Sequence, residues 1–327
     1  MGGIKLHKNL ERLLVELPKV ISKGRADSTV AKYMAGWNGF SQWGESQNLE
    51  TRPAQPFYVC LYLTHLLMEK GNKGSITTAL FGIRWAHHKV GMVSPTDSDI
   101  VQLTYQGCLR SCNREKCRKE PISVEVIKKF VNDYKGKDHC LMRQRFMILC
   151  LLSFAGFFRI KELLSVKLKQ IKVFKSHIEV FLTKSKTDQH REGEIVFIAR
   201  TGTKYCAVSN TLNFLEKAGL DLEKDKEAYL IPTLNRTKEG HIASRYRGIS
   251  YTRAHEIFRE NLKDKNIDVT LYCLHSFRSG GASTAANNGV SERLISKHGR
   301  WSADTSRNGY IKDDKEKRLL ISKNLGL

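Results

Sequence analysis

Hydrophobic residues recur every three or four positions through the first third of the chain. One wide apolar helix face is formed by Val30, Tyr33, Trp37, Phe40 and Trp43. Ser28 stands where a residue would cap the N-terminus of this helix. Similar spacing covers 56–71 and 75–91, each ending at glycine, and a last segment spans about 98–112. Residues 1–110 therefore predict a small, all-helical domain.

The helical pattern resumes at residue 124 and includes an apolar run at 146–158. This run is too short to span a bilayer, and it predicts a buried helix. The period then changes to two, which predicts three short strands at 171–174, 177–183 and 194–199. Helical spacing returns and continues to the end, with an interruption near 232–250. The fold class predicted for the whole chain is mainly α, with a mixed α+β second domain at 124–327 that holds a small antiparallel sheet.

Charge adds a class of partner to this picture. The 327 residues include 55 Lys and Arg against 33 Asp and Glu, a net charge of +22, and both halves of the chain are basic. A basic chain of this kind favours a polyanion, most commonly nucleic acid, over a merely well-solvated surface. The predicted linker, 111–123, together with the residue before it, carries the candidate DNA-contacting residues Arg110, Arg114, Lys116, Arg118 and Lys119. A solvated run of charge explains the same residues equally well.

The N-terminal residues and the cysteines indicate the cellular compartment. The first residues lack the apolar core of a signal peptide, and the chain has eight cysteines, so we expect an intracellular protein with free thiols. Cys108, Cys112 and Cys117 have the wrong spacing for common zinc modules, and we expect no metal site there.

Four short segments carry residues suited to chemistry on phosphate. Arg159 lies three residues before Glu162, so the acid can orient the guanidinium from the same helical face. A turn between two predicted strands carries Lys186, with Lys184 two residues away. His275 precedes Arg278 by three residues, and Trp301 precedes Tyr310 by nine. Each pattern alone is common in proteins that have no such chemistry. Tyr310 alone is typical of a surface residue, and His275 and Trp301 alone are typical of a core.

Taken together, these residues resemble the tyrosine recombinase (integrase) family. The family has an Arg, a Lys in a β-hairpin, His-x-x-Arg, and a His or Trp nine residues before a nucleophilic Tyr. Six residues match this pattern in order, namely Arg159, Lys186, His275, Arg278, Trp301 and Tyr310. Glu162 matches the family's acidic residue, while His298 lies twelve residues from Tyr310 and has the wrong spacing. The matching motifs span about 120–315, and the resemblance implies that residues 1–110 form a core-binding domain.

The resemblance implies a site-specific DNA recombinase that needs no metal ion or ATP. Tyr310 would form a 3′-phosphotyrosine, Arg159 and Arg278 would clamp the phosphate, and Lys186 would protonate the departing 5′-oxygen. His275 would take or share the tyrosine proton, and Trp301 would offer its indole N–H. Lys184 would contact DNA beside the site. The expected partner is double-stranded DNA, and strands would be rejoined through a Holliday junction.

Several alternatives stay open. The same chemistry serves type IB topoisomerases, although His275 favours recombination, and a recombinase-derived DNA-binding protein without activity is a third reading. The C-terminal tail keeps apolar Leu319, Leu320, Ile321 and Leu325, which would dock on a neighbouring protomer of a tetramer or pack on their own domain. The Gly-Arg-Trp sequence at 299–301 resembles eukaryotic mobile-element recombinases of the DIRS-like and Crypton-like groups, which would place the protein in the nucleus.

Overall fold

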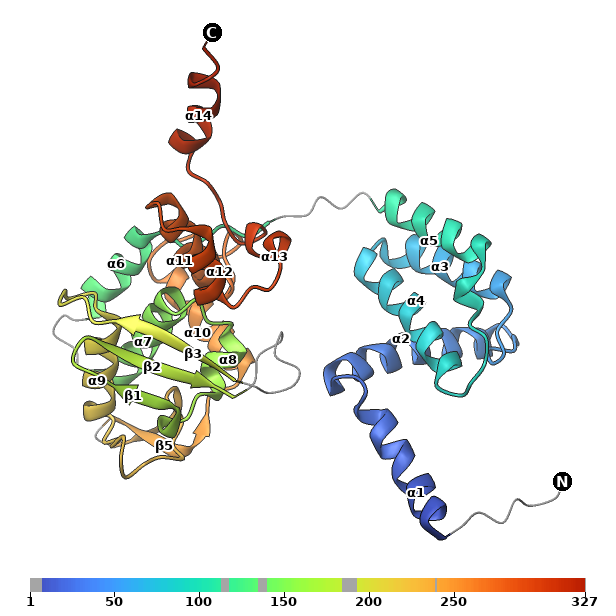
Figure 1. Ribbon diagram of the computed structural model, residues 1–327, viewed down its shortest axis with the longest axis horizontal. Helices are drawn as coiled ribbons and strands as arrows, with labels where there is room; N and C mark the ends of the chain where they lie inside the picture. The colour runs from blue at the N-terminus through green and yellow to red at the C-terminus, as the bar shows by residue number, and fades with distance from the viewer. Residues whose placement is uncertain (1–7, 113–117, 135–139, 184–192, 239, 327) are drawn as a thin grey trace. The chain divides into compact units, whose positions relative to one another are not determined.

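The chain folds into two compact units, residues 1–117 and 118–327. The computed structural model describes residues 8–112, 118–134, 140–183, 193–238 and 240–326 (Figure 1). Helices dominate both units, and the small antiparallel sheet lies in the second, as the sequence predicts. In these ranges, no helix combines the length and the apolar character that a membrane crossing requires.

The first unit is all-helical. Its elements are α1 (Lys8–Lys23), α2 (Asp27–Ser46), α3 (Pro56–Lys70), α4 (Lys73–His88), a short 3-10 helix (Pro95–Asp97) and α5 (Asp99–Ser111). The predicted aromatic face of α2 lies toward the core, where Phe40 is fully buried and Trp37 and Trp43 pack beside it. The predicted cap at Ser28 is wrong. The cap position is Ala26, two residues earlier, which has an extended backbone, and the helix begins at Asp27.

Glycine ends α3 as predicted. Gly71 has a left-handed backbone, with φ of 50°, and its N–H bonds the carbonyls of Leu66 and Leu67. Asn72 caps the next helix, α4, and its side chain accepts a hydrogen bond from the N–H of Gly74. Side chains that bond main-chain N–H groups therefore help to set where helices of this unit begin.

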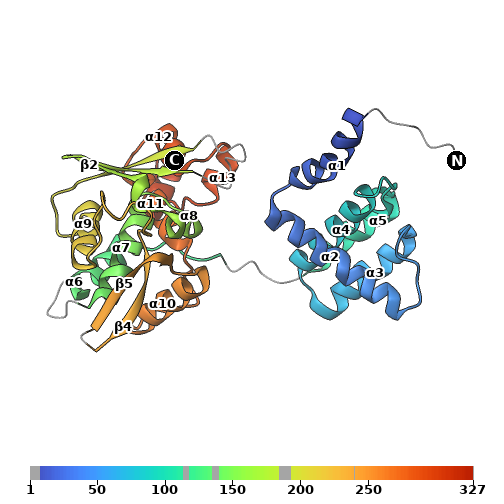
Figure 2. The same ribbon diagram turned by 90° about the horizontal axis from the view of Figure 1, so that it is seen from below.

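The second unit is built around α7 (Leu141–Ala155), which contains most of the predicted apolar run and is buried along nearly all of its length. It contacts α6 (Val124–Tyr134), α9 (Ala207–Lys217) and α11 (Ser276–Asn287), and Figures 1 and 2 show it at the centre of the unit. The remaining helices are α8 (Ile160–Ser165), α10 (Tyr251–Lys263), α12 (Glu292–Gly299), α13 (Asp304–Asn308) and α14 (Lys315–Lys323), with a 3-10 turn at Leu168–Gln170.

The three predicted strands form one antiparallel sheet in the order β1–β2–β3. They are β1 (Ile171–Val173), β2 (His177–Leu182) and β3 (Glu194–Ala199), and Val180 pairs with both Ile171 and Val196. A second hairpin of β4 (Pro232–Thr237) and β5 (Gly240–Gly248) occupies the interruption near 232–250. Period two did not reveal this hairpin because both its strands are rich in polar residues.

The end of the predicted linker at 111–123 lies in the second unit. From Arg118 onward the chain belongs to the second unit. Ile122 is almost fully buried there, and its N–H bonds the carbonyl of Ser276, while the N–H of Glu120 bonds the carbonyl of Leu271. An apolar side chain in the core thus ties the second half of the predicted linker to the second unit.

Candidate active site

The site begins where α7 ends and α8 begins. Arg159 has an extended backbone and occupies the cap position of α8, so it does not share a helical face with Glu162 as the sequence predicted. The contact between them forms nonetheless. Arg159 donates from Nη1 to Glu162 Oε1 at 2.6 Å and from its main-chain N–H to Oε2 at 3.1 Å. The buried carboxylate therefore fixes both the guanidinium and the start of the helix.

Arg278 enters the same region from α11. Its side chain is completely buried, and it donates from Nη1 to the carbonyl of Phe157 and from Nη2 to the carbonyl of Gly299. Phe157 has a left-handed backbone with φ of 47°, a conformation that non-glycine residues rarely adopt. The strained turn after α7 thus presents a carbonyl to the arginine.

Two aromatic rings cover the Arg278 guanidinium. Its carbon lies 4.4 Å from the centre of the Trp301 ring and 5.1 Å from the centre of the Tyr310 ring. The two rings are themselves in contact, with centres 5.3 Å apart. Trp301 is buried, while Tyr310 is partly exposed. The structure therefore brings Arg278, Trp301 and Tyr310 together, as the sequence predicted.

Close packing around Trp301 depends on glycine. A Cβ at Gly299 would lie 1.9 Å from the Trp301 ring, and one at Gly281 would lie 2.2 Å from the carbonyl oxygen of Phe154. Both glycines therefore let main chain and ring approach more closely than any larger residue would allow.

Several polar atoms of the site have no protein partner. In the described part of the chain, the buried atoms without a hydrogen bond include Nε of Arg278 and Nε1 of Trp301. Both are N–H donors, and a buried donor without an acceptor is costly. An anion such as a phosphate oxygen would satisfy them.

The electrostatics of the site also favour an anion. The guanidinium groups of Arg159, Arg278 and Arg300 outnumber the nearby carboxylates of Glu162 and Glu194, so positive charge exceeds negative. Burial and the charges of Arg159 and Arg300 lower the pKa of Arg278 to about 9, at which the guanidinium still carries its charge at neutral pH. Although burial opposes ionisation, the neighbouring guanidinium groups hold the pKa of Glu162 below its usual value.

The other predicted site residues are either exposed or lie outside the described residues. His275 is exposed at the N-terminal end of α11, one turn before Arg278. Lys184, Lys186, Arg114 and Lys116 lie outside the described residues. Arg110 and Arg118 are exposed, and Lys119 is exposed but donates from Nζ to the carbonyl of Thr270.

Sequence reasoning missed Arg300. Its side chain is buried and bonds Glu162 Oε2 through Nη2 at 3.0 Å. Its neighbour His298, set aside for its spacing to Tyr310, bonds the carbonyl of Ala155 at 2.8 Å and meets the Phe157 ring edge-on. Burial, together with the positive charges of Arg300 and Arg278, lowers the pKa of His298. The Gly-Arg-Trp sequence was the only signal that pointed to this segment.

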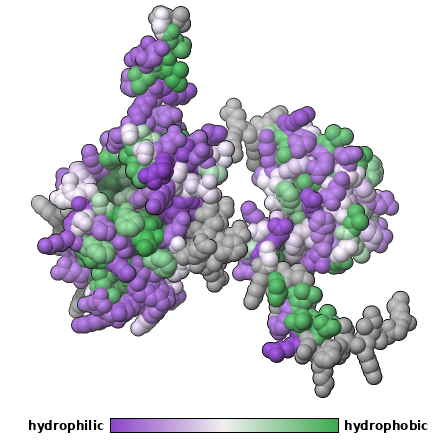
Figure 3. All heavy atoms as spheres, viewed as in Figure 1, coloured by the Kyte–Doolittle hydropathy of each residue, from purple (hydrophilic) through white to green (hydrophobic). Residues whose placement is uncertain are grey.

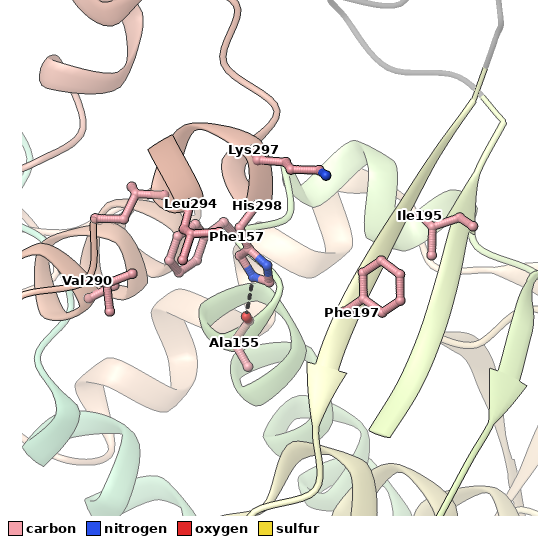
Figure 4. Close-up of a pocket in the computed structure, with 10 residues that line it drawn as sticks. Ala155, Phe157, Ile195, Phe197, Val290, Leu294, Lys297 and His298 are labelled. Atoms are coloured by element: carbon pink, nitrogen blue, oxygen red, sulfur yellow. Dashed lines mark hydrogen bonds between the residues drawn. The ribbon is translucent and has the colours of Figure 1, made fainter. Parts of the chain in front are cut away.

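A cavity of about 550 Å³ adjoins the site. We call it the apolar groove, and its lining includes Phe157, Ile195, Phe197, Val290, Leu294 and His298. Figure 4 shows Ile195 and Phe197 on β3 facing Leu294, Lys297 and His298 across the opening. Four of its apolar side chains, those of Ile195, Phe197, Val290 and Leu294, are between 42% and 54% exposed.

Among the residues described, no three His, Cys, Asp or Glu side chains are grouped so that they could hold a metal ion. The thiols of Cys60, Cys108 and Cys112 are free and buried in the first unit.

Residues 121–317 match the phage integrase family. The chain belongs to the phage integrase family. This match covers the whole of the site just described.

Known relatives agree with this membership. The chain is 22% identical to "Integrase/recombinase xerD homolog" of Selenomonas ruminantium, over 93% of this chain and 87% of that protein. It is similar in fold to a lambda integrase tetramer bound to a Holliday junction (TM-score 0.58, 14% identity, 93% of this chain and 77% of that one). It is also similar to XerH recombinase bound to a palindromic difH substrate in a post-cleavage complex (TM-score 0.57, 12% identity, 90% and 79%).

Proposed function

We propose that this phage integrase family member is a site-specific DNA recombinase whose nucleophile is Tyr310. The observation that carries the assignment is the contact of Arg278 with the rings of Trp301 and Tyr310. The two orphaned donors beside it, Nε of Arg278 and Nε1 of Trp301, are suited to the non-bridging oxygens of one phosphodiester.

The proposed reaction uses these residues together with Arg159, His275 and Lys186. The Tyr310 hydroxyl attacks phosphorus, a bond from phosphorus to the phenolic oxygen forms, and the bond to the 5′-oxygen breaks. His275 accepts or shares the tyrosine proton, and Lys186 gives a proton to the departing oxygen. Arg159 and Arg278 stabilise the charge on phosphorus-bound oxygens. The 3′-phosphotyrosine keeps the energy of the broken bond, so attack by a 5′-hydroxyl of a second strand rejoins DNA without metal ion or ATP.

The proposed partner is double-stranded DNA, held by both basic units. The net charge of +22 supports this, as do the DNA and Holliday junction in the titles of similar structures. Arg110, Arg114, Lys116, Arg118, Lys119 and Lys184 are proposed to contact the phosphate backbone. Because phosphate contacts release counterions, DNA affinity should fall steeply as salt rises.

We propose further that the chain acts as a tetramer on two paired DNA sites. The tail supports this, because α14 buries none of its side chains, and Leu320, Ile321 and Leu325 are more than half exposed. Figure 3 shows hydrophobic surface on the C-terminal segment. The apolar groove of a neighbouring protomer has the matching character, and we propose it as the docking site of α14.

The Gly-Arg-Trp sequence supports a eukaryotic mobile-element origin of the DIRS-like or Crypton-like kind, and with it a nuclear location. Within residues 299–301 the structural role of each residue is distinct: Gly299 makes room for Trp301, and Arg300 bonds Glu162. We regard this sequence as a feature of the catalytic unit.

A covalent trapping experiment tests the function. Sites are first selected from a pool of random-sequence duplexes by binding to Tyr310→Phe, and a nicked suicide version is incubated with wild type. A covalent protein–DNA adduct on a denaturing gel is expected from wild type and not from Tyr310→Phe. An adduct that persists in Tyr310→Phe would remove this nucleophile. Binding without any adduct indicates the inactive DNA-binding alternative, and relaxation of supercoiled plasmid by a monomer indicates a topoisomerase.

A further inference from the structure

Arg300 is a buried charged residue outside the six-residue pattern. Only 5% of its surface is exposed, although arginine is rarely buried unless it is paired. Its backbone is left-handed, with φ of 57° and ψ of 47°, at the C-cap of α12. Residues other than glycine rarely adopt this conformation, because it is strained for any residue with a Cβ. Burial of the charge and the left-handed backbone are both unfavourable, so we expect interactions of the side chain to compensate for them.

The guanidinium of Arg300 joins three separate segments. From Nη2 it donates to Glu162 Oε2 at 3.0 Å and to the carbonyl of Phe157 at 3.1 Å. From Nη1 it donates to the carbonyls of His298 at 3.0 Å and Gly156 at 3.3 Å. Its Nε lies 3.8 Å from a carboxylate oxygen of Glu194.

Three of these partners are linked to proposed catalytic residues. Glu162 is the carboxylate that holds Arg159. The carbonyl of Phe157 also accepts from Arg278, so two guanidinium groups share one oxygen on a strained residue. Glu194 opens β3, the strand that follows Lys186 in the chain.

We propose that Arg300 is a positioning residue that sets the relative placement of the Arg159 and Arg278 guanidinium groups. This rests on the proposed function of the site. Arg300 acts through the Glu162 carboxylate and the Phe157 carbonyl, to both of which its guanidinium donates hydrogen bonds. Its planar fork donates to both at once, which a lysine ammonium on a flexible stem cannot reproduce with the same geometry.

Two variants separate the side chain from the backbone. Arg300→Gly keeps the left-handed turn, which glycine adopts without strain, and removes the guanidinium. Arg300→Lys keeps the charge and loses the fork. A matched control is Arg145→Lys, because Arg145 is equally buried, bonds the carbonyl of Pro232, and lies ten residues before Ala155 on α7, about 15 Å along the helix.

The first readout is adduct formation in a single turnover on the selected suicide duplex, with enzyme in excess, beside the affinity for the same duplex. We expect both Arg300 variants to form adduct at least about 30-fold more slowly, with affinity within about threefold of wild type. This outcome is expected because misplaced guanidinium groups lose more of their stabilisation of the transition state than of their binding to the ground state. The Arg145→Lys protein should cleave at close to the wild-type rate.

Cleavage by Arg300→Lys within about threefold of wild type would overturn the proposal, and this variant decides the matter if Arg300→Gly does not fold. A loss in Arg145→Lys as large as that in Arg300→Lys would also overturn it, since any buried arginine would then have the same effect.

The second readout needs no DNA chemistry. Nitrogen-15 NMR of arginine Nε–H groups, assigned through Arg159→Lys and Arg278→Lys, should show both signals displaced in Arg300→Lys and unmoved in Arg145→Lys. Unmoved Arg159 and Arg278 signals in Arg300→Lys would contradict the positioning role. The two proposals can fail separately. If the wild-type protein forms no adduct but the Arg159 and Arg278 signals are displaced in Arg300→Lys, the recombinase function is refuted and the positioning role is supported.

Discussion

The guanidinium carbon of Arg278 lies 4.4 Å from the centre of the Trp301 ring, and the two side chains are buried together with their Nε–H and Nε1–H groups unbonded. The other two nitrogens of Arg278 already bond main-chain carbonyls. The pair therefore offers a phosphate two fixed N–H donors.

Replacing Trp301 tests the indole donor. Trp301→Phe keeps an aromatic ring over Arg278 and removes the N–H, and we expect adduct formation to slow about 100-fold, the effect of losing one preorganised donor. Trp301→His keeps a ring N–H and should retain more activity than the phenylalanine variant. Single-turnover cleavage measures the difference, and equal rates for the two variants would contradict a donor role.

Gly299 should tolerate no side chain. Gly299→Ala places a Cβ 1.9 Å from the Trp301 ring, so the ring must shift. We expect the free energy of unfolding to fall by about 1–3 kcal/mol and the cleavage rate to fall with it. The control is Gly107→Ala in α5, where nothing lies within 4 Å of the new Cβ and where alanine should stabilise the helix by about 1 kcal/mol. Thermal unfolding of both variants checks this, and a Gly299→Ala protein as stable and active as wild type would refute it.

The sequence revealed those parts of the site that follow a fixed order and spacing. Arg278, Trp301 and Tyr310 were found this way, and the structure brings them into contact. Arg300 could not be found by spacing, because an arginine next to a tryptophan is an ordinary surface pattern. Its burial arises from a left-handed turn and from Glu162, which is distant in sequence.

Part of the fold was also predicted from the sequence. Alternating apolar residues revealed β1, β2 and β3, whereas β4 and β5 were missed because their outward side chains are polar and their pairing is local to one hairpin. The helical face of α2 was predicted correctly, but its start was not, since a cap depends on the backbone of Ala26 rather than on the presence of a serine.

A buried histidine should make the first unit sensitive to acid. His87 is fully buried. Its Nε2 accepts from the N–H of Ala54 at 3.1 Å, and its Nδ1 lies 2.9 Å from the carbonyl of Ile83, a pattern that only the neutral ring satisfies. Burial, with smaller contributions from Arg52 and His88, lowers the pKa of His87 below its ordinary 6.5.

The sign of the effect follows from this shift. Below pH 6.5, His87 becomes protonated in the unfolded chain but stays neutral in the folded unit. The contribution of His87 to the free energy of unfolding is therefore complete above pH 6.5. It falls as the pH drops, by at most about 1.4 kcal/mol per pH unit. Urea unfolding of the full chain, followed by tryptophan emission from pH 7.5 to 5, measures it. His87→Gln should flatten this dependence, and His88→Gln, at an exposed position on the same helix, should not. A wild-type slope that survives in His87→Gln would exclude His87 as the cause.

The tail and the apolar groove should depend on each other across protomers. Ile321 is 72% exposed on α14, and Leu294 is 48% exposed at the groove, so an aspartate at either position leaves the fold of one chain intact. We expect Ile321→Asp and Leu294→Asp each to abolish the tetramer on paired sites while single chains still bind one site. Sedimentation velocity with DNA measures the assembly, and Met68→Asp, at an exposed position in the first unit, is the control.

Mixing the two variants distinguishes docking within one chain from docking between chains. If the tail docked on its own groove, mixing the two variants would not restore any assembly. Docking between protomers predicts instead that the mixture forms dimers, because each mixed pair keeps one intact tail and one intact groove.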